Sequence, residues 1–103
     1  PPPPATKVKL AKQTTKVKAN GKKKIKVSWK KDKKASGYEI TYSTKKSFKG
    51  KKTIVVKSNK TTSKVVKKLT SKKKYFVKVR SYKQVGKTKT YGAYSKVKTV
   101  KVK

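Results

Sequence analysis

The sequence contains no cysteine, no histidine and no methionine, and its only acidic residues are Asp32 and Glu39. The lack of cysteine excludes disulfides and thiol chemistry, and the lack of histidine removes the commonest general base and metal ligand. The many lysines favour the ionised forms of both carboxylates, which is the wrong direction for a general acid. We therefore expect no enzyme activity, no cofactor and no small-molecule substrate. Asp32 is expected in a loop, and Glu39 on the solvent-facing side of a strand.

Long hydrophobic runs are also missing. No segment reaches the length of a transmembrane helix, and none has the apolar stretch of a signal peptide. Because even position 1 is not methionine, we expect the chain to be a piece of a longer protein whose sorting signal lies outside it. Hydrophobic residues make up only 31% of the 103 positions, which limits the core to a modest size.

Positive charge dominates what is present. Thirty-five lysines and arginines oppose the two acids and give a formal net charge of +33. Low hydrophobicity with high net charge is typical of disordered chains. The regular alternation of apolar and polar residues predicts a folded β-structure instead. In the segment 24–30, Ile25, Val27 and Trp29 share one face of a strand, and polar residues take the other face.

Similar alternation places strands along most of the chain. The prolines at the start indicate a linker over residues 1–6, and the domain is expected over residues 7–103. Turn signals such as Asn20-Gly21 separate the strands. The expected strands cover residues 7–10 and 16–19, 24–30, 38–42, 53–56, 63–69, 75–81 and 94–102. About seven short strands without helical periodicity favour a β-sandwich.

The last expected strand has an irregular pattern, because Val97 has the opposite parity to Val100 and Val102. A β-bulge near Lys98-Thr99 is expected to turn all three valines inward. Residues 85–89, which precede this strand, are expected to form a hairpin loop.

The order and spacing of several residues resemble those of a fibronectin type III domain over nearly the whole chain. Trp29 stands in the second strand, residues 37–42 (Gly-Tyr-Glu-Ile-Thr-Tyr) look like the third, and Leu69 precedes Tyr75 by six residues, as in the tyrosine corner of this family. Residues 91–95 stand where the family enters its last strand. The resemblance implies an all-β fold, a seven-stranded antiparallel β-sandwich of the immunoglobulin-like kind.

The lysine-rich segments 27–31, 35–38 and 77–82 are similar to fibronectin type III modules in surface proteins of Gram-positive, clostridial-type gut anaerobes. This resemblance implies a parent protein that is secreted or attached to the cell wall or cell surface. The integrin-binding members of the family carry Arg-Gly-Asp before the last strand. Residues 83–90 lack that tripeptide, so integrin adhesion is not implied.

The exposed faces of the expected strands are rows of cations. The candidate polyanion-binding residues are Lys24, Lys26, Lys30, Lys74, Lys78, Arg80, Lys96 and Lys98. Lysine is a hydrated point charge and Arg80 is the only arginine, so we expect diffuse attraction without sequence specificity. The expected partners are cell-wall teichoic acid, nucleic acid, sulfated glycan or an anionic membrane surface. A purely solvating role, in which lysine rows block edge-to-edge aggregation, is the alternative.

Two hypotheses for function follow from these features. The first is a monomeric, non-catalytic spacer or accessory module of a surface protein, with charge aiding association with polyanions. The second is a dedicated polyanion-binding or cell-penetrating protein, natural or engineered by supercharging.

The aromatic residues fall into two groups. Trp29, Tyr38 and Tyr75 are expected in the core. Two roles remain open for Phe48, Tyr82, Tyr91 and Tyr94: stacking on bases or sugars, or packing against lysine stems.

Overall fold

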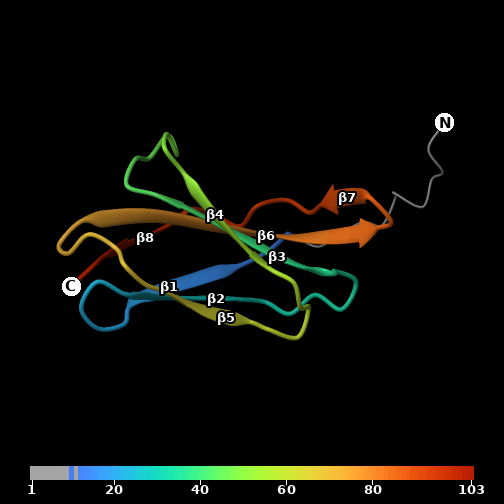
Figure 1. Cartoon of the computed structure of the whole chain (residues 1–103), viewed down its shortest axis with the longest axis horizontal. Coiled ribbons are helices and arrows are strands. Elements are labelled where there is room, and N and C mark those ends of the chain that lie inside the picture. Colours follow the sequence, from blue (N-terminus) through green and yellow to red (C-terminus); the bar gives the residue numbers. More distant parts are fainter. Residues whose placement is uncertain (1–9, 11) are drawn as a thin grey trace.

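The computed structural model describes residue 10 and residues 12–103, and this part of the chain forms two antiparallel sheets (Figure 1). The three-stranded sheet has the order β1-β2-β5, with β1 at Thr15–Ala19, β2 at Ile25–Trp29 and β5 at Ser63–Val66. The second sheet has the order β4-β3-β6-β7, with β8 also paired to β6. Its strands are β4 at Lys52–Val56, β3 at Gly37–Ser43, β6 at Lys74–Val85, β7 at Thr88–Tyr91 and β8 at Lys98–Lys101.

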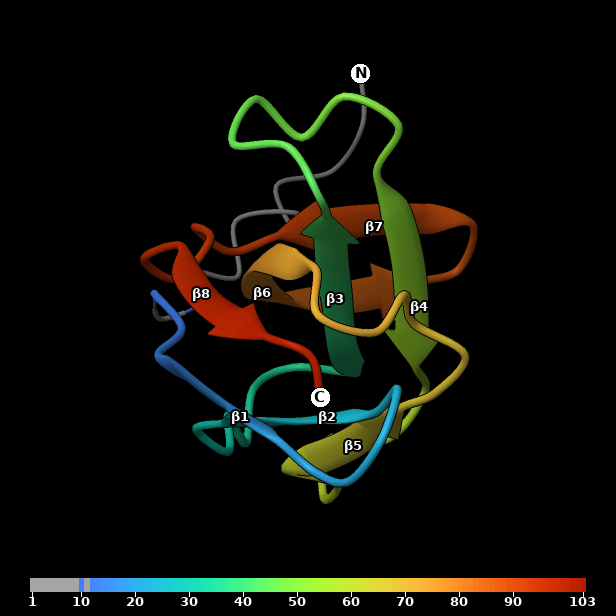
Figure 2. The ribbon, with the colours of Figure 1, turned by 90° about the vertical axis from the view of Figure 1, so that its left-hand side faces the viewer.

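The two sheets stack face to face, as the end-on view in Figure 2 shows, so the expected all-β antiparallel sandwich is confirmed. No helix that could cross a membrane occurs in the described part of the chain. The expected linker at residues 1–6 and most of the expected strand at 7–10 lie outside the described residues; Leu10 is described, and it is buried.

Alternating side chains build the core between the sheets. Ile25 and Val27 of β2 are completely buried and Trp29 is 7% exposed, as their spacing predicts. The Trp29 ring packs on Tyr38 of β3 at 5.5 Å between centroids, and its indole N–H donates to the Thr61 carbonyl at 3.0 Å. Each fully buried aliphatic side chain of this kind contributes about 1.5–3 kcal/mol.

The tyrosine corner expected from Leu69 and Tyr75 is present. Leu69 is buried just before the turn into β6, and the hydroxyl of Tyr75 accepts a hydrogen bond from the Thr70 backbone N–H at 2.9 Å. The corner ties the loop after β5 to the first residues of β6. Along β6, Val77, Val79 and Ser81 follow Tyr75 into the core.

The expectation for the last strand was wrong in two respects. The strand expected over residues 94–102 is only β8 at Lys98–Lys101, with Tyr94 outside any strand, and the additional strand β7 raises the number of strands from seven to eight. The expected hairpin loop at 85–89 is also shorter, because β6 continues to Val85 and β7 begins at Thr88. The turn uses Gly86 with a φ of 59°, in the left-handed region that glycine tolerates.

The β-bulge expected near Lys98-Thr99 is absent. The register of β8 against β6 runs without interruption from Lys98 to Lys101. Val100 and Val102 therefore turn inward, and Val97 remains 46% exposed on the other side. The inner side at this end of the sheet is occupied by Lys98, which stands opposite the fully buried Val77.

Candidate functional site

The candidate polyanion-binding residues do not form one site. Those of β2 and its ends belong to the outer face of the three-stranded sheet, and those of β6 belong to the outer face of the second sheet. The first group is Lys24, Lys26 and Lys30, and the second is Lys74, Lys78 and Arg80. Lys96 and Lys98 lie apart from both groups, in a groove beside β1 at the edge of the sandwich.

On the second sheet, cations and aromatic rings alternate in a single stack. The Lys78 ammonium lies 4.4 Å from the Phe48 ring and 4.1 Å from the Tyr94 ring. The Arg80 guanidinium lies 4.6 Å from the Tyr94 ring and 3.6 Å from the Tyr91 ring. Each cation thus sits between two rings, in the arrangement that the ring quadrupole favours. We call these five residues the aromatic–cation stack.

The stack favours packing against lysine and arginine side chains for the surface aromatic residues. The rings of Phe48, Tyr91 and Tyr94 are in contact with cations of their own chain. Tyr82 is 3% exposed and lies under the Lys89 ammonium at 4.8 Å. These aromatic residues therefore pack against the cations of their own sheet, although Tyr91 remains 41% exposed.

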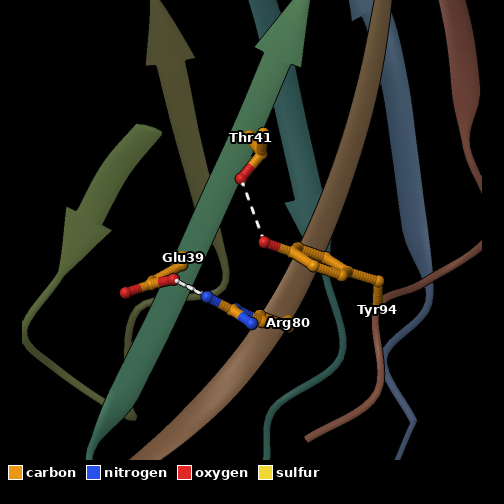
Figure 3. A network of polar contacts seen from close by, with 4 residues as sticks. All are labelled: Glu39, Thr41, Arg80 and Tyr94. Carbon is orange, nitrogen blue, oxygen red and sulfur yellow. Dashed lines mark hydrogen bonds and ion pairs between the residues drawn. The ribbon is translucent and has the colours of Figure 1, made fainter. Parts of the chain in front are cut away.

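Glu39 is not the solvent-facing residue that the sequence predicts. It is only 6% exposed, and its Oε1 accepts hydrogen bonds from Nε of Arg80 at 3.0 Å and from Nη2 at 2.9 Å. Figure 3 shows the Tyr94 ring reaching from the segment after β7 across β6, with its hydroxyl 3.4 Å from Thr41 Oγ1. Glu39 is thus buried in an ion pair with Arg80, at a position that alternation assigns to solvent.

Asp32 stands on the other side of the same sheet. It lies in a loop, as expected, where Oδ1 accepts from the Lys34 backbone N–H at 3.0 Å and Oδ2 accepts from Ser81 Oγ at 3.4 Å. Ser81 is completely buried on the inner face, whereas the neighbouring Arg80 holds Glu39 on the outer face. The two carboxylates therefore face opposite sides of the sheet and do not share a site.

Two tyrosines have perturbed acidity. Burial raises the pKa of Tyr38, and the Asp32 backbone N–H and carboxylate act on it in opposite directions. The Tyr38 hydroxyl accepts from that N–H at 2.8 Å and donates to the Asn59 carbonyl at 2.7 Å. Burial also raises the pKa of Tyr42, with a further contribution from Tyr75. Both hydroxyls are neutral structural groups near pH 7. Among the described residues no cluster of acids could hold a metal ion.

The remaining candidates, Lys96 and Lys98, line a groove of about 370 Å³ between β1 and the segment that enters β8. Lys12, Thr14 and Lys16 form the opposite wall. We call this hollow the seam groove. Sequence reasoning missed Lys12 and Lys16, although their spacing of alternate positions through Thr14 is the signal of one strand face.

Buried polar contacts hold the two walls of the seam groove together. Thr15 Oγ1 donates to Ser95 Oγ at 2.6 Å, and the same Ser95 oxygen accepts from the Val79 backbone N–H at 3.0 Å. The Gln13 side chain donates to the Lys30 carbonyl at 2.6 Å and accepts from the Lys30 N–H at 3.0 Å. The backbone of both walls is therefore fixed to the sandwich.

The family model of the fibronectin type III domain matches residues 11–98, which is most of the chain. The chain belongs to the fibronectin type III family. Among solved structures, the FN1–FN3 domains of chicken CNTN1 match this fibronectin type III domain with 26% identity and a TM-score of 0.74. The match covers 90% of this chain but only 31% of the chicken chain.

The fibronectin type III domain of human contactin 1 matches with 19% identity and a TM-score of 0.71, over 86% of this chain and 73% of that one, which supports the fold. No curated protein matches the chain. Fibronectin type III domains are generally non-catalytic binding or spacer modules, and this domain resembles those of contactin.

Proposed function

We propose that this fibronectin type III domain is a monomeric, non-catalytic spacer or accessory module of a secreted or cell-surface bacterial protein, and that it associates with polyanions through its lysines. The bacterial surface origin rests on the similarity of its lysine-rich segments to modules of Gram-positive surface proteins. Monomeric behaviour follows from the net charge of +33, because two such copies repel each other.

The observation that carries the polyanion proposal is the lack of acidic partners for the lysines among the described residues. The described residues contain one ion pair, Arg80–Glu39, and it uses the arginine. Lys18 stands directly opposite Lys26, and Lys74 directly opposite Lys101, in the strand registers. Like charges in such positions destabilise a sheet. A polyanion relieves this repulsion and also releases its own condensed counterions on binding.

A panel of ligands tests the proposal across a salt series. The panel contains duplex DNA, heparin, teichoic acid and anionic vesicles, each titrated into the domain from low to physiological salt. We expect binding that weakens steeply as salt rises, and a melting temperature that increases with sulfate, phosphate or heparin. Binding that is insensitive to salt, or a melting temperature that stays flat, contradicts the electrostatic proposal.

The second candidate function is a dedicated polyanion-binding or cell-penetrating protein. The spread of lysines over both outer faces, the seam groove and the loops favours it, because supercharged proteins carry charge at most exposed positions. Uptake of the fluorescently labelled domain by cells distinguishes the two. Strong uptake that free heparin abolishes supports this second function, whereas no uptake leaves the accessory-module proposal.

A further inference from the structure

The seam groove owes its charge to lysines at positions where a sandwich ordinarily places apolar residues. Lys98 stands opposite Val77, and residues directly opposite each other share a face of the sheet. Lys98 therefore leaves β8 on the inner side, and Lys96 has the same parity. Both remain exposed because they lie at the edge of the sandwich, where β1 runs past β8. They line the groove together with Lys12 and Lys16 of the β1 wall.

Hydrogen bonds within the domain hold the backbone of the seam groove in place without a ligand. The buried bond of 2.6 Å between Thr15 and Ser95 fixes β1 to the segment that enters β8. Gln13, only 4% exposed, anchors the start of the same wall through both atoms of its amide. The groove therefore keeps its width, and binding costs mainly the ordering of lysine side chains.

The lining of the groove selects the chemistry of the ligand. Four lysines, two threonines and Gln13 line it, and no acidic, arginine or aromatic residue does. Ammonium groups bind phosphate and sulfate as point charges. Without an aromatic platform the seam groove itself does not stack nucleobases, which otherwise contribute about 1–3 kcal/mol per base in single-strand binding. Trp29, which borders an adjoining hollow, is only 7% exposed.

The shape of the groove selects one chain over a duplex or a membrane. A volume of about 370 Å³ holds a short length of a single chain. A duplex or a bilayer presents a broad surface that meets the outer lysines first and does not enter a recess between two sheet edges. Two smaller hollows, of about 300 and 190 Å³, continue from the groove across β1 toward Lys30 and Lys26. Lys16 borders all three.

We propose that the seam groove binds a single flexible chain of phosphate or sulfate groups, with Lys12, Lys16, Lys96 and Lys98 as the primary contacts. This inference rests on the proposed polyanion-binding function and assigns it a place on the molecule. Beyond the groove, the chain crosses β1 along Lys16 toward Lys26 and Lys30. The remaining lysines supply the diffuse attraction that brings the chain to the surface.

Two triple variants with the same change in net charge test this proposal. The seam variant carries Lys16→Gln, Lys96→Gln and Lys98→Gln. The control variant carries three substitutions at exposed loop lysines outside the grooves: Lys45→Gln, Lys46→Gln and Lys60→Gln. Each is titrated with long-chain inorganic polyphosphate, a glycerol-phosphate polymer, heparin fragments and duplex DNA across a salt series. Polyphosphate, glycerol phosphate and heparin separate the two anion sources, phosphate and sulfate.

We expect the seam variant to lose about tenfold more affinity for a single anionic chain than the control variant, and its salt slope to fall by about 2, which is roughly 0.7 for each lost contact. Duplex DNA is expected to weaken equally with both variants. Equal losses with the single chains overturn the seam groove and leave the proposed function intact. A larger loss of duplex DNA in the seam variant overturns the single-chain selectivity. No binding of any polyanion by the unsubstituted domain overturns the proposed function itself.

Amide chemical-shift mapping with a short polyphosphate provides a test that does not depend on a variant. We expect the largest shifts at Thr14, Lys16, Lys96 and Lys98. Shifts spread evenly over exposed lysines of both sheets contradict the seam groove.

Discussion

The substitution Glu39→Gln isolates the ion pair on the outer face of the second sheet. It preserves the shape of the side chain and leaves one carbonyl oxygen to accept a hydrogen bond from Arg80. The guanidinium, however, loses the one charged partner that it has among the described residues, within a chain that carries a net charge of +33. The Glu39 side chain is 8% exposed and that of Arg80 25%, so the pair is shielded but not fully buried.

These exposed fractions set the loss of stability that we expect from Glu39→Gln. Breaking a fully buried pair costs about 3–5 kcal/mol, and an exposed pair contributes only about 0.2–1 kcal/mol. Because glutamine retains one neutral hydrogen bond, we expect Glu39→Gln to lower the free energy of unfolding by about 2 kcal/mol. For a domain of this size that loss lowers the melting temperature by about 10 °C. Urea denaturation followed by Trp29 fluorescence measures it, since Trp29 is the only tryptophan and is buried.

Asp32→Asn is the matched control, because it removes the other carboxylate and raises the net charge by the same single unit. Asparagine can still accept the hydrogen bond from the Lys34 N–H, so we expect a loss below about 1 kcal/mol. Sodium chloride at 1 M shortens the Debye length to about 3 Å and screens general repulsion, but it does not replace a contact of 2.9 Å. Equal losses in the two variants, both removed by salt, would refute a local role for the pair.

Three further substitutions test other parts of the structure. Ser95→Ala leaves the buried Val79 N–H without its 3.0 Å acceptor, and we expect a loss of about 2 kcal/mol in urea denaturation with an unchanged slope. Lys26→Glu replaces repulsion across from Lys18 by attraction, and we expect calorimetry to show a melting temperature about 4 °C higher. Because burial raises the pKa of Tyr38, this residue favours folding below pH about 10, and the contribution is lost as pH rises through the raised pKa. Absorbance at high pH should show a late tyrosine phase that Tyr38→Phe reduces.

The interior of the sandwich was predictable from the sequence, because a strand with one buried face has a period of two. Ile25, Val27 and Trp29 follow that period, and so do Tyr75 and the residues after it. The outer face was predictable only where nothing covers it. Glu39 has the parity of an exposed residue, but it is buried in an ion pair with Arg80, which lies 41 residues later in the chain. The local alternation of residues does not reveal a contact between residues so far apart in the chain.

The prediction for Val97 failed because lysines occupy inner positions of the last strand. The same lysines produce the seam groove. A period of two assigns the inner positions of the last strand to residues 96, 98, 100 and 102, but only Val100 and Val102 are apolar. A bulge would have brought Val97 inward and turned the preceding lysines out. The structure instead keeps the regular ladder and leaves Lys98 on the inner side, where the edges of the sheets part and water reaches it. A lysine at an inward parity thus marks the place where a sandwich opens, and in this domain that place is walled by four lysines.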